Sequence, residues 1–214
     1  MELKNIKANF LGDSITEGHG TTDLATKPFH QLIANKYGMA AARNYGIGGT
    51  RFAKQAKPSV NPRWDLDFCS RFSEMDDDAQ LVVVFGGTND FGHGDAPIGE
   101  FTDRTPDTFY GACHYLMSGL LNKYPDARIV FMTPLHRITE DTPDVKGYVL
   151  KQYVEMIKAV AEYYSIPVLD LWSVSGLQPR VDVIKEKYVP DGLHPNDLGH
   201  EKMAEVIGNY LASI

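Results

Sequence analysis

The amino-acid sequence predicts an α/β fold with a five-stranded parallel β-sheet covered by helices on both faces. Short runs rich in β-branched and aromatic residues alternate with longer segments whose apolar residues recur at helical spacing. The clearest short run, Leu81–Phe85, reads Leu-Val-Val-Val-Phe and is apolar throughout, as expected of a strand with both faces buried. Such alternation of strands and helices is typical of a parallel sheet.

The expected elements follow one another in a regular order along the chain. Strands are predicted at residues 6–11, 41–45, 81–85, 128–132 and 167–171. Helices are predicted at residues 28–37, 106–123, 145–164 and 196–212. The first of these helices begins at Pro28 and ends before Gly38, as capping preferences predict.

Length and composition suit a single globular domain. The chain has 214 residues, of which 43% are apolar and 23% charged, and it contains no internal repeat or linker, so one domain over residues 1–214 is expected. The net charge of −7 disfavours a nucleic-acid partner, because the phosphate backbone is negative as well.

The cysteine content fits a reducing compartment, and the hydropathy of the sequence predicts no membrane span. The two cysteines, Cys69 and Cys113, form no CxxC pair and have no zinc-type histidine spacing, so neither a disulfide nor a metal site is expected. Residues 1–7 are polar, and no apolar run has the length of a signal peptide core or a membrane span. Cytoplasmic residence is therefore the prediction.

Glycine-rich polar clusters follow three of the predicted strands. They lie at residues 12–14, 46–49 and 86–90. Ligands of parallel α/β sheets bind beyond the carboxyl ends of the strands, so the three clusters should converge at one edge of the sheet.

Each polar segment also has an ordinary structural explanation when it is taken alone. A serine between a strand and a helix, such as Ser14, is usually a helix cap. The glycines at 46–49 can form a tight turn, Asn89 can stabilise a turn through its side chain, and residues 191–194 can be a surface loop before a helix.

Together, these segments supply the groups that a serine nucleophile requires. The hydroxyl needs an imidazole to take its proton and a carboxylate to hold that imidazole in the correct tautomer. Asp191 and His194 offer both groups on one short loop bracketed by two prolines. The N–H of Ser14, the N–H of a glycine and the side-chain amide of Asn89 would supply three donors for an oxyanion.

Four segments, in order, resemble the conserved blocks of the SGNH (GDSL-type) hydrolase family. They are Phe-Leu-Gly-Asp-Ser-Ile-Thr at 10–16, Asn-Tyr-Gly-Ile-Gly-Gly-Thr at 44–50, Gly-Thr-Asn-Asp at 87–90 and Asp-Gly-Leu-His-Pro at 191–195. The resemblance implies a flavodoxin-like three-layer α/β/α sandwich and ester hydrolysis through an acyl-enzyme without metal or cofactor. It assigns the glycine donor to Gly49 rather than Gly48. Thr50 departs from the acidic residue that the family often carries there.

The predicted function is a serine esterase acting on a small-molecule ester, with short-acyl esters such as O-acetylated carbohydrates as the favoured substrates. Ser14, Asp191 and His194 form the predicted triad, and Ser14, Gly49 and Asn89 the oxyanion hole. Lysophospholipid or thioester cleavage is an alternative within the class, and a non-catalytic binding module or a flavin protein on the same fold are alternatives outside it. An α/β-hydrolase is excluded, because the chain lacks the Gly-x-Ser-x-Gly elbow.

Other residues near the strand ends are weaker candidates. His93, in the loop at 91–101 that follows Asn89, and His136 and Arg137, which follow the strand at 128–132, are predicted to contact substrate. Asp13 adjoins Ser14 but is expected to be structural. Gly18-His19-Gly20 lacks the residues of a phosphate loop and receives no function from the sequence.

Overall fold

The computed structural model describes residues 2–214 and contains a five-stranded, all-parallel sheet. Its strands are β1 (Lys7–Gly12), β2 (Ala41–Gly46), β3 (Leu81–Phe85), β4 (Arg128–Met132) and β5 (Val168–Leu169). They lie in the order β2-β1-β3-β4-β5, which is the flavodoxin-like arrangement. The predicted fold class is therefore confirmed.

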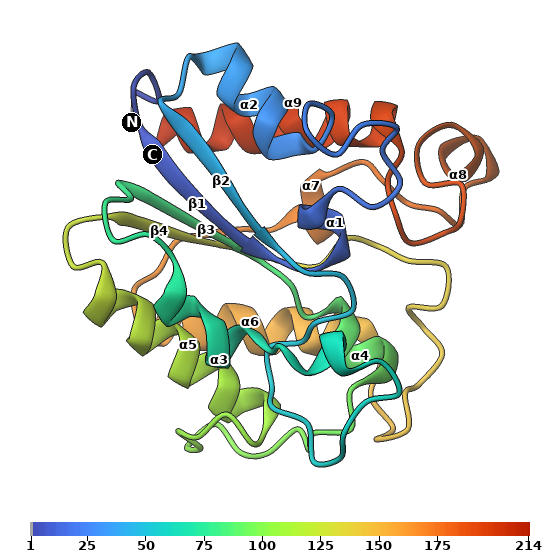
Figure 1. Ribbon diagram of the computed structural model, residues 1–214. Coiled ribbons are helices and arrows are strands. Elements are labelled where there is room, and N and C mark those ends of the chain that lie inside the picture. Colours follow the sequence, from blue (N-terminus) through green and yellow to red (C-terminus); the bar gives the residue numbers. More distant parts are fainter. Residues whose placement is uncertain (1) are drawn as a thin grey trace.

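Helices cover both faces of this sheet and complete the three layers (Figure 1). The helices α2 (Phe29–Tyr37) and α9 (Asp197–Ser213) lie together on one face. On the other face lie α3 (Phe68–Arg71), α4 (Thr88–His93), α5 (Phe109–Lys123) and α6 (Leu150–Tyr163). Three further short helices, α1 (Ser14–Glu17), α7 (Leu171–Val174) and α8 (Asp182–Tyr188), belong to the connections between strands and helices.

The strand β3 shows how the sheet separates two hydrophobic cores. Side chains alternate along a strand, so Val82 and Val84 enter the core beneath α5 and α6. Leu81, Val83 and Phe85 enter the core beneath α2 and α9. All five side chains are buried, which explains why the run carries no polar residue.

The ends of three strands are aligned by the sheet register. Gly12 at the end of β1 pairs with Gly46 at the end of β2 and with Phe85 at the end of β3. The polar clusters that follow these residues therefore emerge at the same edge, as the sequence predicts. This edge also contains the switch in strand order between β1 and β3, where ligands of such sheets bind.

Two predicted helices begin several residues later than expected, and local hydrogen bonding explains both. The helix predicted at 145–164 begins only at Leu150, because the Asp144 carboxylate accepts the N–H groups of Lys146 and Tyr148 and holds a turn. The helix predicted at 106–123 begins at Phe109, because the Thr108 hydroxyl accepts the N–H of Gly111 and caps it.

The last strand is shorter than its apolar sequence suggests. The expected strand at 167–171 is paired only at Val168 and Leu169, and Leu171 already begins α7. Over residues 2–214, no helix is long and apolar enough to cross a bilayer. Cys69 and Cys113 are buried free thiols.

Candidate active site

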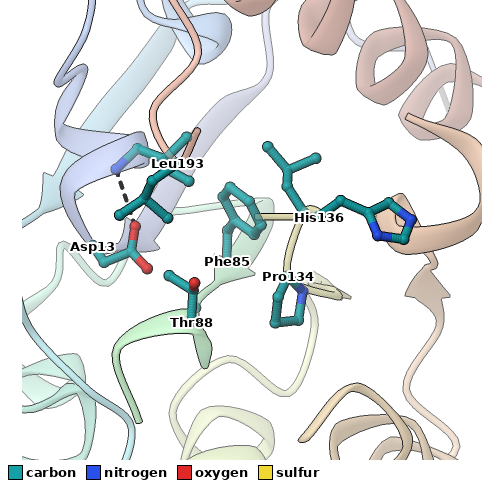
Figure 2. A pocket seen from close by; sticks show the side chains of 9 residues that line it. Asp13, Phe85, Thr88, Pro134, His136 and Leu193 are labelled. Carbon is teal, nitrogen blue, oxygen red and sulfur yellow. Dashed lines mark hydrogen bonds between the residues drawn. The ribbon is translucent and has the colours of Figure 1, made fainter. Parts of the chain in front are cut away.

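Ser14 is the first residue of α1, directly after the end of β1. The side chain that caps this helix is that of Asp13, whose carboxylate accepts the Ile15 N–H at 3.0 Å (Figure 2). The Ser14 hydroxyl is thus not needed as a cap and lies 3.0 Å from Nε2 of His194. Burial raises the pKa of Asp13 to about 7 and leaves this carboxyl a structural role, as the sequence predicts.

His194 and Asp191 lie on the loop before α9 and complete a hydrogen-bonded chain with Ser14. The His194 Nδ1 atom lies 2.7 Å from Asp191 Oδ2. The other oxygen of Asp191 accepts the backbone N–H groups of Leu193 and His194 at 2.8 and 2.7 Å. The carboxylate therefore fixes both the loop and the imidazole, and it favours the tautomer whose Nε2 can accept the serine proton.

Burial and the neighbouring charges keep the His194 imidazole uncharged at neutral pH. Burial lowers the pKa of His194, and it outweighs the opposing effect of the Asp191 carboxylate. Burial alone would raise the pKa of Asp191, but the hydrogen bonds from His194 and Leu193 outweigh it and lower the pKa. At neutral pH Asp191 is thus charged and His194 is uncharged.

Three hydrogen-bond donors lie at the adjacent strand ends. Among the described residues, the N–H groups of Ser14 and Gly49 have no hydrogen-bond acceptor. Gly49 has φ = +79°, a left-handed conformation that favours glycine. Asn89, the second residue of α4, donates one side-chain N–H to the Thr50 carbonyl at 3.0 Å and has a second hydrogen to offer.

Two buried charged residues, Arg71 and Asp90, hold the loop that carries Gly49, and the sequence indicated neither of these roles. The Arg71 guanidinium donates to the carbonyls of Tyr45 and Gly12 and to the Thr50 hydroxyl. The Asp90 carboxylate accepts the N–H groups of Phe52 and Ala53 at 2.9 and 3.0 Å. Burial raises the pKa of Asp90 to about 6. Arg71 joins segments that are distant in sequence, so no local pattern indicated it.

Trp64 and Arg51 are further residues that the sequence reasoning missed. The Trp64 indole packs so closely on Gly49 that a Cβ there would overlap it. Its loop is held by the Arg51 side chain, which is 2% exposed and donates to Ser59 Oγ, the Trp64 carbonyl and Asp65 Oδ1 at 2.6, 3.1 and 2.9 Å. A tryptophan and an arginine outside any motif carry no signal of such a role.

Two open hollows flank His93, next to these donors. One, of about 340 Å³, is lined by Phe91, Arg137, Thr139 and Thr142, among others. The other, of about 330 Å³, is lined by Arg51, Lys57, Ser59 and Trp64, among others. His93 and Asp95 line both, and the His93 ring lies 4.7 Å from that of Trp64.

Arg137 and His136, which the sequence predicts to contact substrate, lie in different surroundings. Arg137 donates to the carbonyl and hydroxyl oxygens of Thr88 at 3.1 and 3.3 Å, while its buried Nε has no partner among the described residues. His136 lies 2.8 Å from Glu140 and packs on Trp172 with ring centroids 3.9 Å apart. Arg137 thus lines the first of the two hollows, whereas His136 lines neither.

A narrow gap lies beside Asp13, at the ends of β1 and β3 (Figure 2). Phe85, Thr88, Pro134 and Leu193 line it, and the His136 ring points away from it. The gap admits no water-sized sphere, so it is a packing defect rather than a substrate cavity.

One set of three potential metal-ligating side chains comes together within residues 2–214. One ligand atom each from His19, Asp191 and His194 lies within 4.8 Å of the others. The sequence analysis assigned no function to His19.

The sequence and the fold were compared with those of known proteins. A sequence model of the GDSL-like lipase/acylhydrolase family matches residues 10–202. A GDSL lipase of Mycobacterium tuberculosis is 28% identical over 204 residues, which are 92% of this chain and 78% of that protein.

Solved structures resemble the whole fold. A protein from Lactobacillus plantarum is 27% identical with a TM-score of 0.85, and the match covers 98% of both chains. A lipase/acylhydrolase from Enterococcus faecalis, at 19% identity and a TM-score of 0.65 over 97% and 96% of the two chains, shares the fold.

Proposed function

The chain belongs to the GDSL-like lipase/acylhydrolase family, and we propose on that premise that it is a serine esterase of short-acyl esters, such as O-acetylated carbohydrates. The observation that carries the proposal is the continuous chain of hydrogen-bond contacts from Ser14 through His194 to Asp191. Membership makes the chain an acylhydrolase; the triad, the oxyanion hole and the substrate class are the proposed part.

In the acylation half of the reaction, the Ser14 hydroxyl attacks the ester carbonyl carbon. Nε2 of His194 takes the hydroxyl proton, while Asp191 stabilises the imidazolium that forms. The bond between the carbonyl carbon and the alcohol oxygen then breaks, and His194 returns its proton to the departing alcohol. The product of this half is an acyl ester on Ser14.

In the deacylation half, water takes the place of the alcohol. His194 accepts a proton from the water as its oxygen attacks the acyl carbon, and the proton then passes to Ser14 Oγ as the acyl bond breaks. Both tetrahedral intermediates place a negative oxygen where the N–H groups of Ser14 and Gly49 and the amide of Asn89 are free to donate.

The surroundings of the triad support a polar alcohol part and a short acyl part. The two hollows beside His93 have mixed linings, in which Arg137, Arg51 and the hydroxyl side chains stand beside apolar residues and Asp95; the charged and hydroxyl groups among them can bind a hydroxylated substrate. In this proposal His93 and Arg137 contact the substrate, and the rigid indole of Trp64 bounds the space beside Gly49. The contact predicted for His136 stays a prediction.

Chain-length preference tests the substrate part of the proposal. Initial rates on acetyl, butyryl and octanoyl p-nitrophenyl esters should fall as the acyl chain lengthens, with Ser14→Ala as the background control. Acetate should also be released from an O-acetylated oligosaccharide. An optimum at the octanoyl ester would overturn the short-acyl proposal and favour the lysophospholipase or thioesterase alternative. No turnover of any ester would favour the non-catalytic alternative.

A further inference from the structure

His19 lies against the proposed general base, although the mechanism makes no use of it. The ring centroids of His19 and His194 are 4.2 Å apart, and the two planes are inclined by 59°. His19 is exposed to solvent, and the Asp191 side chain is half exposed. His19 and Asp191 are thus accessible to a solute ion, and the His194 side chain, which is 16% exposed, contacts both.

The backbone holds His19 in this place through two glycines and one hydrogen bond. Gly18 has φ = +107° and ends α1, and the His19 N–H donates to the Ser14 carbonyl at 2.8 Å. Gly20 has φ = +95°, and a Cβ there would overlap the Pro195 carbonyl and approach the His194 Cβ to 3.4 Å. The Gly-His-Gly segment is thus fitted against the loop of the proposed base.

Two imidazoles and a carboxylate are a ligand set for transition metals. Imidazole suits Zn²⁺, Ni²⁺ and Cu²⁺, whereas Mg²⁺ prefers oxygen ligands only. Zinc sites with three protein ligands commonly leave a fourth position to water. One ligand atom from each residue lies within 4.8 Å of the others. An ion that binds all three side chains must displace His194 from its contact with Ser14 or from its contact with Asp191 Oδ2. We propose that His19, Asp191 and His194 bind a divalent transition-metal ion such as Zn²⁺, and that this binding reversibly inhibits the enzyme.

Binding of the ion to either ring nitrogen of His194 blocks the proposed base. An ion on Nε2 occupies the lone pair that accepts the Ser14 proton. An ion on Nδ1 replaces the hydrogen there, so the neutral ring carries its remaining hydrogen on Nε2 and has no lone pair left for Ser14. The binding part of this proposal stands on the three side chains alone; the inhibition part rests on the proposed function.

Calorimetric titration of the Ser14→Ala protein with ZnCl₂ tests the binding part without any activity. We expect saturable binding of one Zn²⁺, and no binding of Mg²⁺. His19→Gln in the same background should weaken Zn²⁺ binding at least about tenfold, since even outer partners of metal ligands contribute that much. His93→Gln, which removes a histidine outside the set, should leave the affinity unchanged. Equal affinity with and without His19, or a dissociation constant above about 1 mM, would overturn the proposal.

The inhibition part is measured as the ratio of rates with and without ZnCl₂, so that the basal rate of each variant cancels. The wild-type protein should be inhibited by Zn²⁺ and regain its rate when EDTA is added. His19→Gln should need at least about ten times more Zn²⁺ for the same inhibition. Binding without inhibition would refute the assignment of His194 as the base, whereas inhibition that ignores His19 would refute the metal site.

Discussion

The proposed reacting groups and the residues that line the neighbouring hollows are held in place by different means. Ser14, Gly49 and Asn89 stand within a few residues of strand ends that the sheet register aligns. Arg51 and Trp64 stand on the long connection after β2, which the side-chain hydrogen bonds of Arg51 support, and His93 ends α4, the helix that also carries Asn89.

From this difference we infer that the strand-end groups carry the reaction, whereas the loop residues determine which ester is preferred. Groups fixed by the register of a parallel sheet keep their places while the loops around them change. We therefore expect substitutions among the reacting groups to abolish turnover of every ester alike. Substitutions in the loops should instead change which ester is preferred.

The largest effect is expected from the loss of the nucleophile or of the base. Ser14→Ala and His194→Ala should each lower kcat by on the order of 10⁴–10⁶, and the double variant should lose little more, because the two residues act as a unit. Steady-state kinetics on p-nitrophenyl acetate measures this. Thermal unfolding is the control, since both residues are only partly buried and their loss should leave the fold intact. Additive losses would argue that the residues act separately.

Asn89 tests the oxyanion part of the reacting region. Asn89→Ala should lower kcat by about 10²–10³ on all ester substrates, because it removes one donor from the oxyanion. The change also breaks its hydrogen bond to the Thr50 carbonyl, so unfolding by urea is measured alongside. A loss of stability with unchanged kcat would show a structural role only.

The pH dependence tests the charge state of His194. A base is active when it is unprotonated, and burial lowers the pKa of His194 below 6.5. We expect kcat/KM to rise with pH, about tenfold per unit on the acid limb, and to be half-maximal below pH 6.5. A half-maximal point above pH 6.5 would show that Asp191, and not burial, dominates.

Arg51 tests the support of the loops and should have the smallest effect. Arg51→Lys keeps the charge but loses the forked set of donors to Ser59, Asp65 and the Trp64 carbonyl. We expect KM to rise about fivefold, equal to about 1 kcal/mol, with the ranking of acyl chains altered and kcat less affected. Equal losses of kcat on all esters would place Arg51 with the reacting groups instead.

Much of the fold could be predicted from the sequence because its signals are local. The run at 81–85 has no polar position, and Pro28 and Gly38 mark the ends of α2 at their preferred places. The boundary of α6 could not be predicted, because it depends on the Asp144 carboxylate competing for backbone N–H groups.

The site was partly predictable for the same reason. The residues whose roles a motif indicates occur in short segments, three of them at strand ends and one on the loop before α9. The structure brings Ser14 into contact with His194 from that loop. Arg71, Arg51 and Trp64 act across 8 to 59 positions of sequence, so their partners become visible only in three dimensions. His19 lies next to His194 although 175 residues separate them.

Covalent labelling tests the central assignment most directly. A fluorophosphonate reacts with an activated serine hydroxyl, and peptide mass spectrometry locates the adduct. We predict a single adduct on Ser14 in the wild-type protein, and none in Ser14→Ala. Equal labelling of the two proteins, or an adduct on another serine, would contradict the assignment of Ser14 as the nucleophile.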